Sequence, residues 1–329
     1  MSRHPSAPHP ADPHSLYASG FYGRALNILE KSSAQRALSV EEKVLRTQLL
    51  ERTGAVKKAI LAGQELLKER GLTVTDGCKL RHALGHSYFV IGRHGLGTEE
   101  YEHGIRLAET HGAHVAACNL RISMFRDRIR WIGPYHATSE VNQLRRQVHR
   151  AADPVLSTKF QMYLVELAAK LGLFRKARRH LSIAQELLAT VDDHALMVNV
   201  GLTEAALTAQ QGDLGRALEL SLKLVDSVNR TGDASASLAI ATNLGHLLIA
   251  QTRHSDALRW LHEELEAQRH RGGHGGGPEV ALRDTLMLLH VSRGDLDEAN
   301  SEAARIQSLL RDSHDSISFY GLWHVVTRV

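Results

Sequence analysis

Proline is scarce in this chain of 329 residues once the first 13 residues are passed. Of the seven prolines, four lie in that leader, and only Pro134, Pro154 and Pro278 come after it. Proline breaks helices and is common in the turns of β folds, so this distribution favours long helices. Aromatic residues make up only 5% of the chain, but apolar residues make up 43%, which excludes a disordered polypeptide.

Membrane and secretion signals are missing as well. No apolar run reaches the roughly 18 residues of a transmembrane helix, and the N-terminus MSRHPSAPHPADPH has no apolar signal-peptide core. Two cysteines, Cys78 and Cys118, are too few for a disulfide-stabilised secreted scaffold. We expect a cytoplasmic protein without a membrane partner, with a disordered Pro/His-rich leader at 1–13 and a folded solenoid at 14–329.

The motifs of common enzyme classes are also absent. The sequence has no GxxxxGK[ST], GxSxG, HExxH or CxxC, and GGHGGG at 272–277 lacks the lysine and preceding strand of a nucleotide loop. Cys78, His82 and His86 share a helix face, but the first and last are about 12 Å apart, too far for one metal ion. We therefore expect a non-catalytic protein with no metal site and no cofactor.

Internal repeats are the main positive signal. The stretches LGLFRKARRHL (171–181), QGDLGRALELS (211–221) and SRGDLDEANSEA (292–303) each place an alanine five residues after a turn glycine. These alanines and a further copy at Ala257 lie 40, 40 and 42 residues apart, and two earlier copies at Ala25 and Ala59 lie 34 apart. A period of 34–42 residues is the length of one helix–turn–helix unit.

Each unit contains apolar residues at helical spacing. From Leu238 to Ala250 they recur every three or four residues, as on one helix face. A small residue at the start of the second helix allows the two backbones to cross closely, and the Gly212-Asp213 pair suits a left-handed glycine followed by a helix cap. The pattern predicts eight helix pairs at 14–32, 40–70, 78–111, 114–151, 156–191, 196–231, 236–271 and 277–312. The fourth is the least regular, with WIGPYH (131–136) as its turn, and Pro278 begins the eighth.

These units resemble tetratricopeptide repeats. Leu84-Gly85, Tyr88, Gly92, Gly97 and Tyr101 follow the repeat pattern well, and Leu244-Gly245 with Leu248 and Ala257 follows it in a second copy. The consensus tryptophan and closing proline are mostly missing, and the longer period is similar to that of repeats in bacterial regulators and signalling ATPases. The resemblance covers roughly 15–329 and implies an all-α, right-handed superhelix of antiparallel helix pairs.

The resemblance also implies a binding role, because such solenoids mostly bind proteins, peptides or ligands. We expect the N-terminal sensor or scaffold portion of a larger bacterial regulatory or signalling protein. The apolar end, SISFYGLWHVVTRV (316–329), supports this if it is the first helix of a ninth unit in a longer chain. The alternative is that this helix caps the solenoid by packing against the eighth pair.

The first helix of each pair lines the concave surface in tetratricopeptide repeats. Aligning the repeats predicts a binding groove in which units three and four attract anions and unit seven contributes polar residues: Lys79, His82, His86, Arg126, Arg130, Asn243 and His246. Arginine binds a carboxylate or phosphate through two parallel hydrogen bonds, so an acidic peptide or an acidic segment of an effector domain would suit the groove. The lysine and asparagine clamp of chaperone-binding members is not reproduced.

A basic block at 121–180 leaves an alternative open. It carries 13 Lys and Arg against four acids, a net charge of +9 within a chain of net +4. Such a block could bind nucleic acid with strong salt dependence, although few aromatic residues lie beside it for stacking on single strands. The third interpretation is a solvated helix face whose arginines pair with acids on neighbouring repeats. We favour the protein- or peptide-binding interpretation over nucleic acid.

Overall fold

The computed structural model describes residues 12–271 and 276–311, and all regular structure in these ranges is helical. The helices are α1 (Pro13–Ala18), α2 (Tyr22–Ser33), α3 (Val40–Arg52), α4 (Val56–Leu66), α5 (Val74–Val90), α6 (His94–Thr110), α7 (His114–Asp127), η1 (Arg128–Ile132), α8 (Pro134–Ala137), η2 (Thr138–Glu140), α9 (Val141–Ala151), α10 (Pro154–Lys170), α11 (Phe174–Leu188), α12 (His194–Gln210), α13 (Leu214–Thr231), α14 (Ala234–Ala250), α15 (His254–His270), α16 (Gly277–Arg293) and α17 (Leu296–Arg311). The all-α prediction is confirmed.

Within the described residues the helices form eight consecutive pairs. They are α1–α2, α3–α4, α5–α6, α7–α9, α10–α11, α12–α13, α14–α15 and α16–α17, packed mainly against their sequence neighbours. Each pair has an A helix, its first, and a B helix, its second. The fourth is irregular, as predicted: α7 continues into the π-helix η1, and Gly133 with φ 133° turns the chain into α8 at Pro134. Pro278 lies in the first turn of α16, also as predicted.

The repeat alanines explain the close packing within each pair. In seven pairs the fourth residue of the B helix is small: Ala25, Ala59, Gly97, Ala177, Ala217, Ala257 and Ala299. All six alanines are buried, with Ala217 and Ala257 completely so. A Cβ on Gly97 would lie 2.8 Å from the Gly85 carbonyl oxygen of the facing helix. The predicted role of these residues at the helix crossing is therefore confirmed. The exception is Leu144, in the irregular fourth pair.

The turns between paired helices follow the predicted chemistry. Gly212 adopts φ +90°, a left-handed conformation that costs glycine little. The Asp213 carboxylate that follows accepts a hydrogen bond from the Arg216 backbone N–H, 3.1 Å away, and caps α13.

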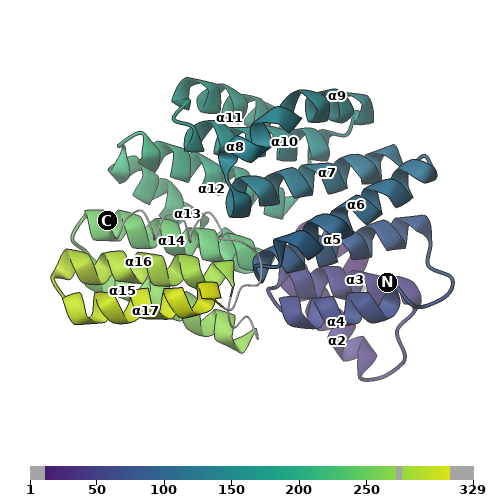
Figure 1. Cartoon of the computed structure of the whole chain (residues 1–329), viewed down its shortest axis with the longest axis horizontal. Helices are drawn as coiled ribbons and strands as arrows, with labels where there is room; N and C mark the ends of the chain where they lie inside the picture. The colour runs from purple at the N-terminus through teal and green to yellow at the C-terminus, as the bar shows by residue number, and fades with distance from the viewer. Residues whose placement is uncertain (1–11, 272–275, 312–329) are drawn as a thin grey trace, which may run out of the picture.

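The superhelix closes on itself, which the repeat pattern did not indicate. Figure 1 shows the pairs following one another around the molecule, so that the purple N-terminal pairs lie beside the green and yellow C-terminal ones. At this closure, α2 contacts α13, and the His194 N–H donates to the Ser19 carbonyl at 3.1 Å. A Cβ on Gly232 would lie 2.8 Å from Gly23 Cα, so two glycine backbones touch there. The concave surface therefore surrounds a central space.

Two further outcomes concern the ends and membranes. The leader residues 1–11 and the apolar segment 316–329, with Phe319, Leu322, Trp323 and Val326, lie outside the described residues. α1 begins at Pro13, with the Asp12 side chain as its N-cap. Across the described ranges, every helix is too short or too polar to cross a bilayer.

Candidate functional site

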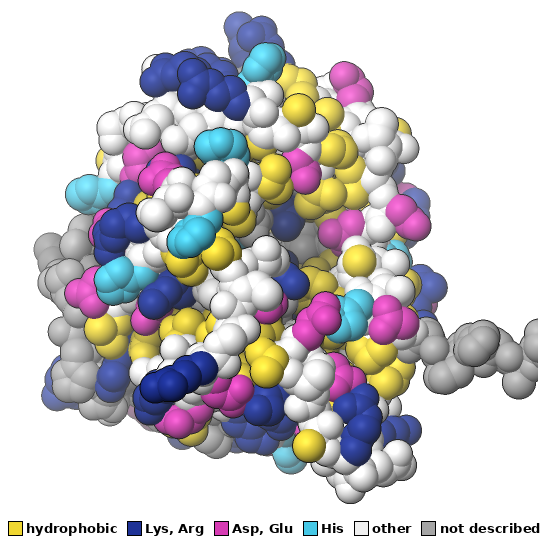
Figure 2. Space-filling model, turned by 90° about the vertical axis from the view of Figure 1, so that its right-hand side faces the viewer, with side chains coloured by type: hydrophobic (Ala, Val, Ile, Leu, Met, Phe, Trp, Pro, Cys, Tyr) yellow, Lys and Arg dark blue, Asp and Glu magenta, His cyan; other side chains and the backbone are white. Residues whose placement is uncertain are grey.

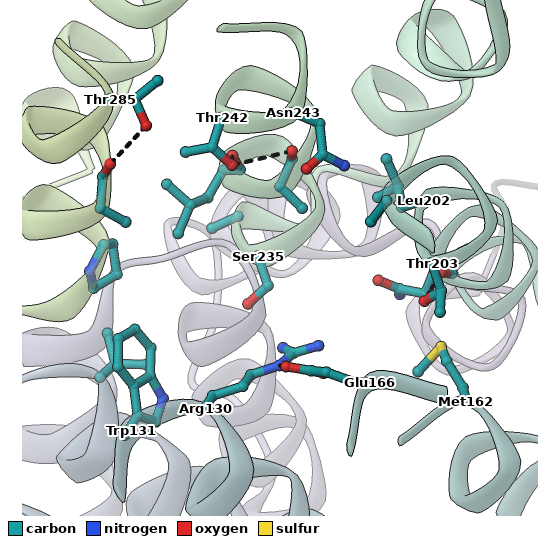
Figure 3. Close-up of a pocket in the computed structure, with 18 of the residues that line it drawn as sticks. Arg130, Trp131, Met162, Glu166, Leu202, Thr203, Ser235, Thr242, Asn243 and Thr285 are labelled. Carbon is teal, nitrogen blue, oxygen red and sulfur yellow. Dashed lines mark hydrogen bonds and ion pairs between the residues drawn. The ribbon is translucent and has the colours of Figure 1, made fainter. Parts of the chain in front are cut away.

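The central space holds a partly open cavity of about 470 Å³ on the concave side of the solenoid. The A helices of the second, third and fifth to eighth pairs contribute to its wall, together with η1 of the fourth pair, as Figure 3 shows for the residues that it labels. Gly54 and Arg271, which meet at the closure, complete the wall. Because so many repeats share one space, the closure of the superhelix turns a groove into a pocket.

The wall is periodic, because equivalent positions of successive A helices face the same space. Thr203 and Asn243 are 40 residues apart, and Thr285 follows 42 residues later; all three line the cavity. The same step relates Glu166, Ala206 and His246 on α10, α12 and α14. Met162, Leu202 and Thr242 form a further set of this kind. At one position of the repeat, successive A helices thus present different types of side chain to the cavity.

The neutral polar side chains of the wall are held by their own helices. Thr203 donates to the Asn199 carbonyl at 2.8 Å, and Thr285 donates to the Ala281 carbonyl at 3.0 Å. The Asn199 amide likewise donates to the Ala195 carbonyl at 2.8 Å. These bonds occupy donors and leave hydroxyl and amide oxygens able to accept. The Asn243 amide points into the cavity (Figure 3) and offers both a donor and an acceptor.

The charged groups of the wall are balanced. Arg130 Nε lies 3.0 Å from Glu166 Oε2, and the Arg130 guanidinium also lies over the Tyr163 ring, 5.9 Å from its centroid. At the closure, Arg271 Nη2 lies 3.3 Å from Glu264 Oε1. Both arginines therefore already have carboxylate partners, and the pocket is not simply a cationic binding site for anions.

Beneath the wall, His86 connects the cavity to a buried charge network. The Asp127 carboxylate, completely buried, accepts from Arg126 Nε at 2.8 Å and from the Tyr101 hydroxyl at 2.7 Å. Burial alone would raise the pKa of the Asp127 carboxyl, but Arg126 and His86 outweigh it and hold that pKa well below its usual range. His86 Nδ1 is 2.7 Å from Arg126 Nη2, and His86 Nε2 is 3.5 Å from Glu51 Oε1.

Four of the seven predicted groove residues line the cavity: His86, Arg130, Asn243 and His246. Desolvation lowers the pKa of His246, and Asp284 opposes this. The remaining three, Lys79, His82 and Arg126, are not part of the wall.

Lys79 and His82 are absent from the wall because α5 lines the cavity only near its C-terminal end, at His86 and Val90. His82 lies one turn earlier and forms a 2.7 Å hydrogen bond from Nε2 to Ser123 Oγ. Arg126 is buried against Asp127. Within the described ranges, no cluster of three or more His, Cys, Asp and Glu is arranged to hold a metal ion.

The sequence did contain a signal for wall residues that the prediction missed. Stepping back 40 residues from Asn243 gives Thr203, and two such steps from His246 give Glu166, the partner of Arg130. Equivalent positions of neighbouring repeats therefore carry information about the wall that no single unit shows. Trp131 had no such signal, because it lies in the irregular fourth pair.

Comparison with known proteins supports the fold. No family model and no curated protein sequence matches the chain. Among solved structures, a Rap protein complexed with Competence and Sporulation Factor is similar, with a TM-score of 0.62 and 11% identity over 96% of this chain and 90% of that one. The Cut9–Hcn1 assembly of the APC/C follows with a TM-score of 0.55 and 15% identity over 92% of this chain and 55% of that one. The fold of the chain is therefore that of a right-handed tetratricopeptide-repeat solenoid.

Proposed function

We propose that this chain is a non-catalytic module that binds a peptide or an extended protein segment in its central cavity. The observation that carries the proposal is the periodic wall, in which successive A helices present amide and hydroxyl groups to one space. An extended peptide has a repeating series of N–H and C=O groups, which such side chains can pair with. The cavity volume of about 470 Å³ lies within the usual range of ligand pockets.

The similar solenoid fold of the Rap protein supports the same proposal, since its solved structure is a complex with Competence and Sporulation Factor. The charge balance of the wall favours a neutral or mixed-charge segment. The acidic partner expected from the sequence stays a prediction, and Arg130 is the residue that would contact it. An acidic ligand would have to compete with Glu166 for this guanidinium.

A regulatory role is the finer part of the proposal. A segment bound inside a closed superhelix would contact both sides of the closure and stabilise the closed form over an open one. An attached domain could respond to that change, as expected for the sensor portion of a larger signalling protein. The alternative is a scaffold that only holds its partner.

The proposal is tested by filling the cavity. Ala239 of α14 lines it, whereas Ala250 at the end of the same helix is exposed outside it. A library of random twelve-residue peptides displayed on their own mRNA is selected on the wild-type chain, and the enriched peptides are then titrated against Ala239→Trp and Ala250→Trp. We expect the first variant to lose binding at least tenfold and the second to retain it. Equal affinities for both variants, or no peptide enriched above background, would reject the cavity as the binding site.

A further inference from the structure

A second surface, on the convex side, carries the exposed part of the basic block. Helices α9 and α11 both pack on α10 and are the B helices of consecutive pairs. Their exposed faces hold seven cationic side chains: Arg145, Arg146, Arg150, Arg175, Lys176, Arg178 and Arg179. We call these seven residues the outer basic surface. Figure 2 shows Lys and Arg side chains gathered at the top of the molecule, the end where Figure 1 places α9 and α11.

The structure divides the basic block into two parts. The inner arginines have carboxylate partners: Arg121 with Glu109, Arg126 with Asp127, Arg128 with Glu140 and Arg130 with Glu166. The outer basic surface has no carboxylates of this kind nearby in the sequence, because neither 141–152 nor 167–185 contains an aspartate or glutamate. The interpretation of the basic block as a solvated face whose arginines pair with acids therefore fits the inner arginines but not the outer basic surface.

Other exposed helices of the chain show that this arrangement is unusual here. On α13, Glu219 pairs with both Arg216 and Lys223. On α15, Asp256 pairs with both Arg253 and Arg259. Within the described part of the chain, none of the seven cations of the outer basic surface forms an ion pair; Arg178 hydrogen-bonds the neutral Gln211.

The cations of the two helices act on a common region. His180 Nδ1 of α11 donates to the Gln161 side-chain oxygen of α10 at 2.8 Å. Burial lowers the pKa of His180, and Arg145, Arg179 and Lys176 lower it further. Arg145 belongs to α9 and the other two to α11, so positive charge from both helices converges on one imidazole.

We propose that the outer basic surface is a docking site for the phosphate backbone of a nucleic-acid duplex. Six of its seven cations are arginines, which bind phosphate oxygens through paired N–H donors. The surface is convex and charged, with Arg146 and Arg150 one helical turn apart on α9 and Arg175 and Arg179 one turn apart on α11. Rows of cations on two helices that both pack on α10 match a partner with regularly spaced anions.

The composition of the surface argues against a protein or a membrane as the partner. A protein interface usually has an apolar or aromatic anchor at its centre. Within α9 and α11 the large apolar side chains are buried or half-buried, with Leu144, Val148 and Leu181 in the core; Leu173, the residue before α11, is exposed at the edge. Aromatic groups for stacking on single strands are also missing from the outer basic surface, so a duplex is favoured.

The test measures binding of a fluorescein-labelled 20-base-pair DNA duplex of random sequence by anisotropy at 50, 100 and 200 mM NaCl. Each phosphate contact contributes about −0.9 to the slope of log K against log salt, so five contacts give a slope of about −4.5. The test variant is Arg145→Glu with Arg179→Glu. Its control is Lys57→Glu with Lys58→Glu, which makes the same change of net charge on exposed residues of α4.

We expect the test variant to lose at least tenfold in affinity and its slope to become shallower by about 2, with the control close to wild type. The cavity variant Ala239→Trp should bind DNA normally, which separates this proposal from peptide binding. Helix content measured by circular dichroism should be equal in all variants, since the substituted residues of the test pair and its control are exposed. Equal losses in the test variant and its control would overturn the proposal. So would binding of poly-glutamate or phosphatidylserine vesicles that depends on this surface while the duplex does not bind.

Discussion

Arg52 and Asp233 are 181 positions apart in the sequence, yet Arg52 Nη1 lies 3.4 Å from Asp233 Oδ2. Arg52 is the last residue of α3, and Asp233 is the N-cap of α14, whose carboxylate also accepts from the backbone N–H groups of Ser235 and Ala236. One buried carboxylate thus starts a helix in the seventh pair and pairs with a cation from the second. This contact links the two sides of the closure.

Replacing Arg52 by methionine should open the closure. Asp233 is only 2% exposed, so removing its cation leaves a buried carboxylate with less compensation. Arg52 is itself 18% exposed in its side chain, so we expect a loss of about 2 kcal/mol in the free energy of unfolding rather than the larger penalty of a fully buried pair. Urea denaturation measures the loss, and small-angle X-ray scattering should show a larger radius of gyration.

The control for this prediction is Arg46→Met. The ion pair between Arg46 and Glu30 is more exposed, at 33% and 43% of the two side chains, and should contribute less than about 1 kcal/mol. An Arg52→Met variant with unchanged radius and stability would show that the other closure contacts suffice.

Two glycine-to-alanine substitutions should change the stability of the chain in opposite directions. Alanine is favoured over glycine within helices by up to about 1 kcal/mol. At Gly215 of α13 an added Cβ meets nothing within 4 Å, so Gly215→Ala should raise the melting temperature slightly. At Gly97 of α6 it would lie 2.5 Å from Phe89 Cδ2, and the resulting overpacking should cost about 1–3 kcal/mol and outweigh the propensity gain. Stabilisation by both variants would contradict the close crossing of α5 and α6.

The alanines at the helix crossings should not tolerate a larger residue. Ala217 and Ala257 are completely buried where their B helices cross the paired A helices. Leucine at either position should overpack the crossing and destabilise the chain by roughly 1–3 kcal/mol. Thermal unfolding followed by circular dichroism measures this. Ala250→Leu, on an exposed site, should leave the melting temperature nearly unchanged, and identical melting of all three variants would disprove the repeat register.

His82 should make the fold sensitive to mild acid. Burial lowers the pKa of His82 well below its ordinary value of 6.5, and Arg126 and Arg52 lower it further. Below about pH 6.5 His82 is therefore protonated in the unfolded chain but stays neutral in the folded chain. The contribution of His82 to the free energy of unfolding is fully present above that pH and decreases as the pH falls toward the folded-state pKa. We expect His82 to account for about 1–2 kcal/mol of the stability lost between pH 7 and pH 5.

The measurement is urea denaturation at pH 7, 6 and 5. His82→Gln, which keeps a donor for Ser123, should flatten the pH dependence even if it lowers stability at pH 7. His103→Gln, on an exposed site of α6, should leave the dependence as in wild type. A wild-type slope retained in His82→Gln would assign the effect to other groups.

Only some of the residues that line the cavity could be predicted from the sequence, and particular residues show why. Asn243 and His246 were predicted from their repeat position and do line the cavity. Lys79 was predicted in the same way, but only His86 and Val90 of α5 line the cavity. Arg126 was predicted as a groove residue, but in the structure it pairs with the adjacent Asp127. The sequence does not show that this neighbour is completely buried and takes up the guanidinium.

The sequence by itself determined the local architecture. Its period, its scarcity of proline and the small fourth residue of seven B helices depend on contacts within one helix pair or between neighbours, which are short-range and repeat along the chain. Only the tertiary structure decided that the ends of the superhelix meet around a central cavity. Closure results from small rotations added over eight pairs, and it is held by contacts such as Arg52 with Asp233 that no local pattern records.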